Sequence, residues 1–179
     1  MAHEIIVGVS GGIAAYKTAA LVSDLVQSGI GVTAVMTRAA QKFVGPATFQ
    51  ALTGRRVLTR TFDRHDYPLG PHIELSRQAE LLCIAPATAH LMAQAAHGLA
   101  DDLLSTLLVS FSGPVVLAPA MNCEMWENPA VQRNVEQLRA DGFHLVGPNE
   151  GWLSCRVQGM GRMAEPAEIA AVVKELLQN

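Results

Sequence analysis

Short apolar runs alternate with helical stretches along almost the whole chain, and this alternation is what most constrains the fold. The runs are nearly continuous in apolar residues, which is typical of parallel strands buried on both faces. Five strands are expected, at residues 4–9, 32–36, 81–85, 115–118 and 143–146. Helical periodicity or a favourable proline predicts helices at residues 13–28, 43–52, 88–96, 101–110, 129–140 and 166–177. The sequence therefore predicts a doubly wound, Rossmann-like α/β fold with a parallel sheet covered by helices on both faces.

Length, composition and charge narrow the class of protein. The 179 residues suit one domain with a full core, so residues 1–179 are expected to form a single domain. Half of the residues are hydrophobic and 16% are charged, which excludes a disordered chain. The net charge of −3 gives no electrostatic reason to expect a nucleic acid as partner. The low charged fraction agrees either with subunits that cover part of the surface or with a large core alone.

Neither a targeting segment nor a membrane partner is predicted. The first segment is apolar, but it carries Glu4, lacks a basic region and is interrupted at residues 10–12. No uninterrupted apolar run approaches the roughly 18 residues that a membrane span needs. Cys83, Cys123 and Cys155 are odd in number and widely spaced, so neither a disulfide framework nor a metal site is expected. A reducing, cytoplasmic location fits best.

Ligands of doubly wound folds bind at the carboxyl ends of the strands, so the loops that follow the strands are the candidate sites. The first loop reads VSGGIAA and opens a helix, and its free N–H groups suit a phosphate or a flavin edge. It matches neither GxGxxG nor the Walker motif, so a plain strand-to-helix turn is an equal alternative. The third strand ends in PATAH, where Thr88 either contacts a phosphate or simply caps a helix. His90 and His97 share a helical face without a further ligand, which favours ordinary surface histidines over a metal pair.

Two later segments carry more reactive side chains. In APAMNCEMW at 118–126, the amide of Asn122 suits a carboxylate, whereas core packing is favoured for the methionines and the tryptophan, and Cys123 is left unassigned. In the glycine-rich stretch 147–163, Cys155 lies beside Arg156 in an expected flap, which makes it a better candidate for chemistry than Cys83 inside an apolar strand.

A histidine at the end of the long polar loop 59–72 is a further candidate. His72 is a possible acid or base near neutral pH, although a plain surface or capping histidine is the commoner outcome at such a position.

Together these segments resemble one family over nearly the whole chain, the homo-oligomeric flavin-containing cysteine decarboxylases. The matching segments are SGGIAAYK at 10–17, HIELSR at 72–77, APATA at 85–89, HGLADDLLS at 97–105, APAMNCEMW at 118–126, and GWLSC with GMGRM between 151 and 163. The combination of APAMNxxMW with HIELSR is highly specific. Within the family, a cysteine in the late flap resembles the phosphopantothenoylcysteine decarboxylases in particular.

The resemblance implies an activity, a cofactor and a role for each matching residue. The activity is FMN-dependent decarboxylation of 4'-phosphopantothenoylcysteine to 4'-phosphopantetheine, a step of coenzyme A biosynthesis. His72 matches the catalytic histidine, and Cys155 matches the flap cysteine that donates a proton. Asn122 matches the asparagine that binds the substrate carboxylate, with Met121 and Ala120 beside it. The positions expected to contact the flavin are Ser10, Gly11, Gly12, Ile13, Thr37, Ala87, Thr88, Ala89, His90 and Ala120.

The resemblance also implies partners. The family assembles as homotrimers or dodecamers with FMN at the subunit interface, so His72 is expected to act on a flavin held largely by a neighbour. A phosphopantothenoylcysteine synthetase is expected to be absent or separate, since the chain stops after Asn179. Two positions depart from the family, which usually has Ala-Asn-Thr where this chain has Ala89-His90-Leu91, and Gly where it has Arg156.

Three alternatives remain open. A peptidyl-cysteine decarboxylase stops at the enethiol and needs no proton donor, so Cys155 argues against it. A flavin prenyltransferase has similar glycine-rich turns and should lack the PAMNxxMW run. A non-catalytic flavin-binding regulatory subunit usually has long acidic extensions and altered active residues, whereas this chain keeps His72, Asn122 and Cys155 together.

Overall fold

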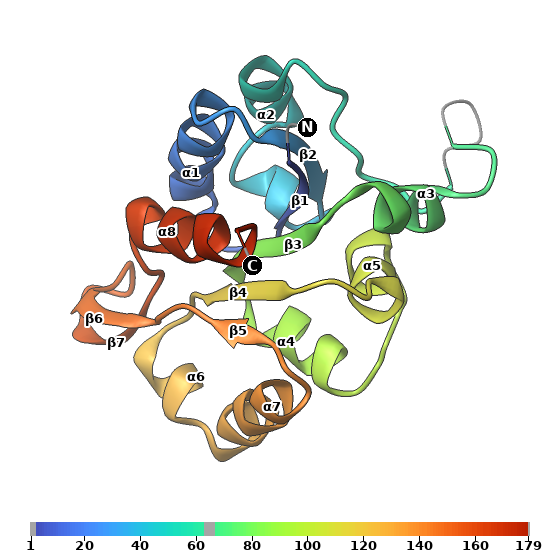
Figure 1. Ribbon diagram of the computed structural model, residues 1–179. Coiled ribbons are helices and arrows are strands. Elements are labelled where there is room, and N and C mark those ends of the chain that lie inside the picture. The colour runs from blue at the N-terminus through green and yellow to red at the C-terminus, as the bar shows by residue number, and fades with distance from the viewer. Residues whose placement is uncertain (1–2, 63–66, 179) are drawn as a thin grey trace.

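A five-stranded parallel sheet lies at the centre of the molecule (Figure 1). The structure is a computed structural model, and it describes residues 3–62 and 67–178. The strand order is β2-β1-β3-β4-β5, and every pairing within this sheet is parallel. The strands are β1 (Glu4–Val9), β2 (Gly31–Met36), β3 (Leu81–Ala87), β4 (Val115–Pro119) and β5 (His144–Leu145). Nearly every residue of β1, β3 and β4 is buried, as expected for strands covered on both faces. The predicted doubly wound α/β fold is confirmed.

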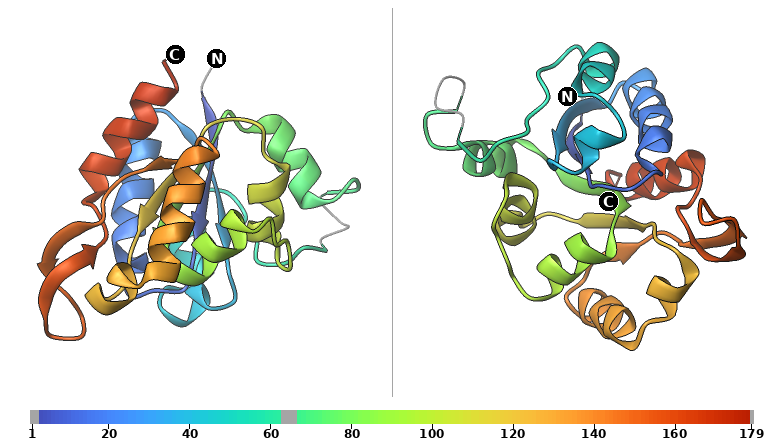
Figure 2. Two further views of the ribbon diagram at one scale, coloured as in Figure 1. Left: turned by 90° about the horizontal axis from the view of Figure 1, so that it is seen from below. Right: turned by 180° about the vertical axis from the view of Figure 1, so that it is seen from behind.

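Helices cover both faces of the sheet and enclose two apolar clusters (Figures 1 and 2). On one face, α1 (Ala15–Gln27), α2 (Pro46–Thr53) and α8 (Pro166–Leu176) pack around Leu21, Phe49 and Ile169. On the other face lie α3 (Pro71–Gln78), α4 (Ala89–Ala96), α5 (Leu103–Ser110) and α7 (Pro129–Ala140), with Leu104 and Leu138 at their centre. This three-layer packing leaves the loops at the carboxyl ends of the strands to form a site.

Several boundaries differ from the prediction. The third strand continues through Pro86 to Ala87, with a cis peptide bond between Ala85 and Pro86. The expected helix 43–52, for which a break near Gly45-Pro46 was also expected, begins only at Pro46, as α2, and the preceding residues include a separate 3-10 turn, η1 (Ala40–Lys42). An extra short helix, α6 (Cys123–Glu127), begins at an Asn122 cap and ends before the proline that opens α7.

The glycine-rich stretch expected as a loop is instead an antiparallel hairpin, β6 (Asn149–Trp152) with β7 (Gln158–Arg162). The segment is poor in β-branched residues, so its composition carried no strand signal. The hairpin projects from the body beside α6, at the end of the sheet opposite the two termini (Figure 2). Among the described residues, no helix is long and apolar enough to cross a bilayer.

Candidate functional site

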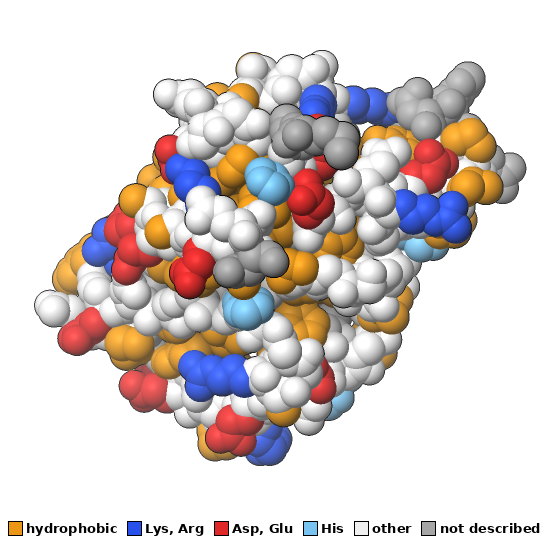
Figure 3. Space-filling view, viewed as in Figure 1, with side chains coloured by type: hydrophobic (Ala, Val, Ile, Leu, Met, Phe, Trp, Pro, Cys, Tyr) orange, Lys and Arg blue, Asp and Glu red, His pale blue; other side chains and the backbone are white. Residues whose placement is uncertain are grey.

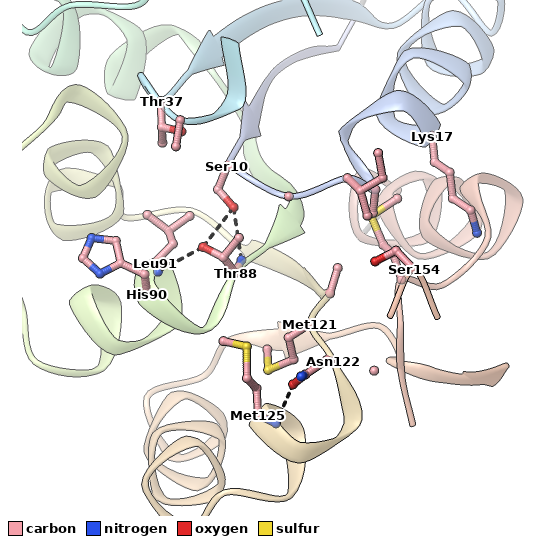
Figure 4. A pocket seen from close by; sticks show the side chains of 18 of the residues that line it. Ser10, Lys17, Thr37, Thr88, His90, Leu91, Met121, Asn122, Met125 and Ser154 are labelled. Carbon is pink, nitrogen blue, oxygen red and sulfur yellow. Dashed lines mark hydrogen bonds between the residues drawn. The ribbon is translucent and has the colours of Figure 1, made fainter. Parts of the chain in front are cut away.

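A pocket of about 760 Å³ opens at the carboxyl ends of the strands, within the size range of small-molecule and cofactor sites. Its floor lies between β1 and β3, which is where the order 2-1-3-4-5 reverses direction and where doubly wound folds bind their ligands. The loops after β1, β2, β3 and β4 all contribute to it, and the hairpin closes one side. Figure 4 shows how these loops converge.

A hydroxyl network ties the floor of the pocket together. The buried Ser10 donates from Oγ to the Pro86 carbonyl at 2.7 Å and accepts from the Thr88 N–H at 3.1 Å. Thr88 in turn caps α4, because its Oγ1 accepts from Leu91 N–H at 3.3 Å (Figure 4). Thr88 therefore caps the helix, and the same residue lines the pocket.

The loop after β1 is pressed against the loop after β2. A Cβ added at Gly11 would lie 2.3 Å from the Cβ of Ala39, so this position accepts only glycine without a shift of the backbone. Behind this contact, Thr37 Oγ1 accepts from Ala40 N–H at 3.1 Å and fixes the second loop. The glycine is thus required by a close approach between loops.

The turn that leads into α1 leaves two backbone donors unpaired. Among the described residues, the N–H groups of Ile13 and Ala14, which line the pocket just before the first residue of α1, have no backbone acceptor. Neutral N–H and hydroxyl donors on the floor and apolar side chains on the walls, including Leu91 and Met121, form a donor set that suits a phosphorylated planar cofactor such as a flavin nucleotide.

Asn122 lies on the wall formed by the turn after β4. Its Oδ1 accepts from Met125 N–H at 2.8 Å, so the amide nitrogen is left to donate to a ligand (Figure 4). The hairpin is bonded to the same turn, since Met121 N–H donates to the Gly161 carbonyl at 2.9 Å. Of the residues for which the sequence alone favoured core packing, Trp126 does pack on the core, whereas Met121 and the half-exposed Met125 also line the pocket.

The structure brings most of the predicted site residues together. Those that line the pocket are Ser10, Gly11, Gly12, Ile13, Thr37, Thr88, His90, Ala120, Met121 and Asn122. Ala87 and Ala89 do not line it, although Ala87 holds the neighbouring loop through a 3.1 Å hydrogen bond from Ala120 N–H to its carbonyl. His90 takes a lining position on the first turn of α4, where the family usually has asparagine.

The two predicted catalytic residues lie outside this pocket. Cys155 is exposed in the turn that joins β6 to β7. His72 lies in the first turn of α3 rather than at the end of a loop, and its Nδ1 is buried without a hydrogen-bond partner among the described residues. Cys83 is fully buried in β3, and burial raises the pKa of its thiol to about 12, so it is a core residue as predicted.

Several lining residues were not singled out from the sequence. Three of them are cationic and lie on α1, on the loop after β2 and on the hairpin, and the others extend the polar and apolar walls. These residues are Tyr16, Lys17, Arg38, Gln94, Asp102, Trp152, Ser154 and Arg162. Lys17, and Asp102 of the HGLADDLLS segment, were visible in the matching motifs, but only the fold shows that they line the pocket.

The fold and the site define a class, an α/β domain that binds a nucleotide-like cofactor at the switch point of a parallel sheet. The sequence matches the Flavoprotein family over residues 1–178, and the chain belongs to that family. The expected family is thereby confirmed.

Similar proteins agree with this membership. The chain is 44% identical over 173 residues to the coenzyme A biosynthesis bifunctional protein CoaBC of Bacillus subtilis, a match that covers 97% of this chain and 43% of that protein. The chain thus spans less than half the length of this relative. Among solved structures, a cysteine-to-serine mutant of a PPC decarboxylase complexed with pantothenoylaminoethenethiol superposes with a TM-score of 0.87 at 28% identity over 100% of both chains. The FMN-dependent cysteine decarboxylase SpaF gives a TM-score of 0.84 at 36% identity, covering 98% of this chain and 96% of that one.

Proposed function

We propose that residues 1–179 act as an FMN-dependent decarboxylase domain that converts 4'-phosphopantothenoylcysteine to 4'-phosphopantetheine. The observation that carries the proposal is the arrangement of Asn122 and the hairpin on one wall of the pocket. Asn122 presents a free amide donor there, and the same turn is bonded to the hairpin that carries Cys155. The similarity to CoaBC and to a PPC decarboxylase structure supports the substrate.

The reaction must solve one chemical problem, because an α-amido carboxylate that loses CO2 leaves a carbanion with no acceptor. Bound FMN would supply a reversible hydride acceptor for the carbon that bears the thiol, so that no external oxidant or reductant is consumed. With the thiol proton removed, that carbon becomes a thioaldehyde and the carboxylate lies β to a C=S bond. Loss of CO2 then gives an enethiolate, in which the sulfur holds the negative charge.

The chain supplies orientation and proton transfer. Asn122 would hold the carboxylate through its amide N–H so that the breaking bond stands out of the plane of the π system. His72 would assist removal of the thiol proton. Cys155 would protonate the carbon that lost CO2. The net change is loss of CO2 and gain of one proton, without an external reductant.

The separation of His72 from the pocket of its own chain supports a site shared between subunits. Apolar side chains are exposed around the mouth of the pocket, with Ile13, Tyr16 and Trp152 all more than half exposed. Exposed apolar surface of this kind marks a contact with another molecule. We infer a homotrimer, or a dodecamer built from trimers, in which His72 of one subunit faces the pocket of another. A synthetase partner and a cytoplasmic location stay predictions.

A peptidyl-cysteine decarboxylase is a second candidate, because SpaF, at 36% identity against 28% for the PPC decarboxylase structure, is described as an FMN-dependent cysteine decarboxylase without that substrate. Cys155 on the hairpin opposes it, because an enzyme that stops at the enethiol needs no proton donor there.

The test is the visible absorbance of the purified protein, followed by addition of 4'-phosphopantothenoylcysteine and mass analysis of the product. A yellow protein that forms 4'-phosphopantetheine supports the proposal. A yellow protein that forms only the enethiol supports the peptidyl-cysteine type. A protein that FMN cannot reconstitute contradicts both readings and favours a non-catalytic role.

A further inference from the structure

Two cations share one carboxylate at the side of the pocket nearest the hairpin. Lys17 Nζ of α1 donates to Glu165 Oε1 at 2.9 Å, and Arg162 Nη2 of β7 donates to the same oxygen at 2.5 Å. Lys17 and Arg162 both line the pocket, and the Lys17 side chain is only 12% exposed. Figure 4 shows Lys17 on the same side of the pocket as Ser154 of the hairpin, across from Thr37 and His90.

The backbone of the hairpin is shaped to place Arg162 there. The register of β6 with β7 shifts between Asn149 and Glu150, and Gly161 has a φ of +132°. A Cβ at Gly161 would lie 2.3 Å from the Met121 carbonyl oxygen, so this strand approaches the Asn122 turn more closely than a side chain would allow. Across the hairpin, Gly151 leaves room for the Arg162 stem, whose Cδ lies 2.9 Å from where a Cβ would stand. Bulges of this type re-aim side chains beside active sites.

The cluster keeps unused donors and a net positive charge. The hydrogen bond from Lys17 lowers the pKa of Glu165, so the carboxylate stays ionised at neutral pH and the three groups sum to +1. Each cation donates one N–H to Glu165. The Lys17 ammonium has three donors in all and the Arg162 guanidinium has five. The remaining donors suit an anion with several acceptor oxygens, and a guanidinium matches a phosphate in geometry as well as in charge.

Two phosphate monoesters take part in the proposed reaction, one on the cofactor and one on the substrate. The floor around Ser10 and Thr88 offers neutral hydroxyl and N–H donors, whereas the hairpin side offers cations. The hairpin strand that carries Arg162 is bonded through Gly161 to the turn that carries Asn122, so both lie on one wall. We propose that Lys17 and Arg162 bind the phosphate monoester of the substrate, an assignment that rests on the proposed function.

The experiment compares 4'-phosphopantothenoylcysteine with the same compound lacking its phosphate. Steady-state kinetics and calorimetric binding are measured for the wild type, Arg162→Gln, Lys17→Gln and Arg162→Lys, all loaded with FMN. Arg162→Gln should raise KM and Kd for the phosphorylated compound about tenfold to a hundredfold, the range for one charge-assisted hydrogen bond, with little change in kcat. Values for the compound without phosphate should change less than about twofold, and Arg162→Lys should restore part of the difference.

A matched control is Lys174→Gln, since Lys174 also joins α8 to α1, through Asp24 at 3.2 Å, and does not line the pocket. It should leave the preference for the phosphorylated compound intact. Equal losses on both compounds would mean a structural role and overturn the assignment. So would a selective loss in Arg38→Gln but not in Arg162→Gln.

A separate arm distinguishes the two phosphates. The affinities of the apoprotein for FMN and for riboflavin are measured by flavin fluorescence. If Arg162→Gln weakens FMN but not riboflavin, the cluster binds the cofactor phosphate and the assignment fails. If the wild type decarboxylates neither compound, the proposed function fails and this assignment fails with it. If the wild type decarboxylates both compounds, and Arg162→Gln and Lys17→Gln keep its preference for the phosphorylated one, only the assignment is overturned.

Discussion

The two ends of the parallel sheet are built in opposite ways. At the amino end, polar and charged side chains pair with each other: Arg55 with Glu4 at 2.5 Å, and His3 with Glu80 at 2.9 Å. Figure 3, in which this end faces the viewer, shows acidic and basic side chains interspersed over the surface. At the carboxyl end, hydroxyls and N–H groups surround a hollow, and several N–H groups there have no backbone acceptor among the described residues.

The difference shows where polar groups are paired within the chain and where they are left free to bind a ligand. A polar group that is already paired adds stability and has little left to offer a ligand. Donors held open by the sheet and by helix starts are available when a ligand arrives. Substitutions at the carboxyl end should therefore change binding and turnover, and those at the amino end should change stability alone.

The largest effect is expected at His72, outside the pocket of its own chain. His72→Asn should lower kcat by about 10²–10⁴, the usual contribution of a general acid or base, while the FMN content stays that of the wild type. Visible absorbance and product mass measure the two quantities. His97→Asn, at the exposed end of α4, is the control and should keep full activity.

A mixing experiment sharpens this prediction. Inactive His72→Asn and Asn122→Ala proteins, combined and allowed to exchange subunits, should regain on the order of a quarter of the wild-type activity if each site draws the two residues from different subunits. No recovery after demonstrated exchange would mean that His72 and Asn122 act within one chain, against the inferred arrangement.

The second-largest effect is expected at Cys155, which lies on the hairpin and not on the floor of the pocket. Cys155→Ser should still release CO2, but formation of 4'-phosphopantetheine should fall at least about 10²-fold, because the proton donor is lost, and the oxidised enethiol should accumulate. Mass spectrometry of the product measures the ratio. Cys123→Ser, a partly buried cysteine beside Gly159, serves as the matched control. Full conversion by Cys155→Ser would remove its assigned role.

A smaller effect tests the close approach of the first two loops. Gly11→Ala places a methyl 2.3 Å from Ala39 Cβ and should lower the free energy of unfolding of the apoprotein by about 1–3 kcal/mol. Gly12→Ala is the control, because its nearest neighbour would be Thr88 Cγ2 at 3.7 Å, an ordinary contact. Urea unfolding of both variants measures the difference. Equal losses would show that backbone freedom rather than the Ala39 contact decides the choice of glycine.

The layers of the fold were predictable because they follow from local pattern. Continuous apolar runs gave β1, β3 and β4, and prolines in the first turn marked the starts of α7 and α8. The hairpin was missed because its pairing rests on glycine contacts with the Asn122 turn, which lie outside the segment itself. Helix α6 was missed because it has only five residues and depends on a side-chain cap.

The residues of the candidate site also fall into those that the sequence could predict and those that it could not. Residues that follow strands, such as Ser10, Thr37 and Thr88, were predictable because the topology fixes where the strands end. Arg162 and Gln94 were not, since their place in the pocket depends on a bulge and on the packing of α4. Arg156 stands where the resembling family usually has glycine, and its backbone has a left-handed φ of 65°. Glycine adopts this conformation at little cost, which explains the usual residue at this position.

The smallest effect is expected at the amino end. The hydrogen bond from Arg55 lowers the pKa of Glu4, so the pair contributes stability above the unfolded pKa of the carboxyl and loses it as the pH falls through the lowered folded value. Both side chains are more than a third exposed, which limits the contribution at neutral pH to roughly 1 kcal/mol or less. Glu4→Gln should therefore destabilise the protein slightly at about pH 7 and hardly at all at about pH 3, with an unchanged affinity for FMN. Urea unfolding at the two pH values and flavin fluorescence measure these quantities. An equal loss at both pH values would assign the effect to packing, and a weaker FMN affinity would mean that the two ends of the sheet are coupled.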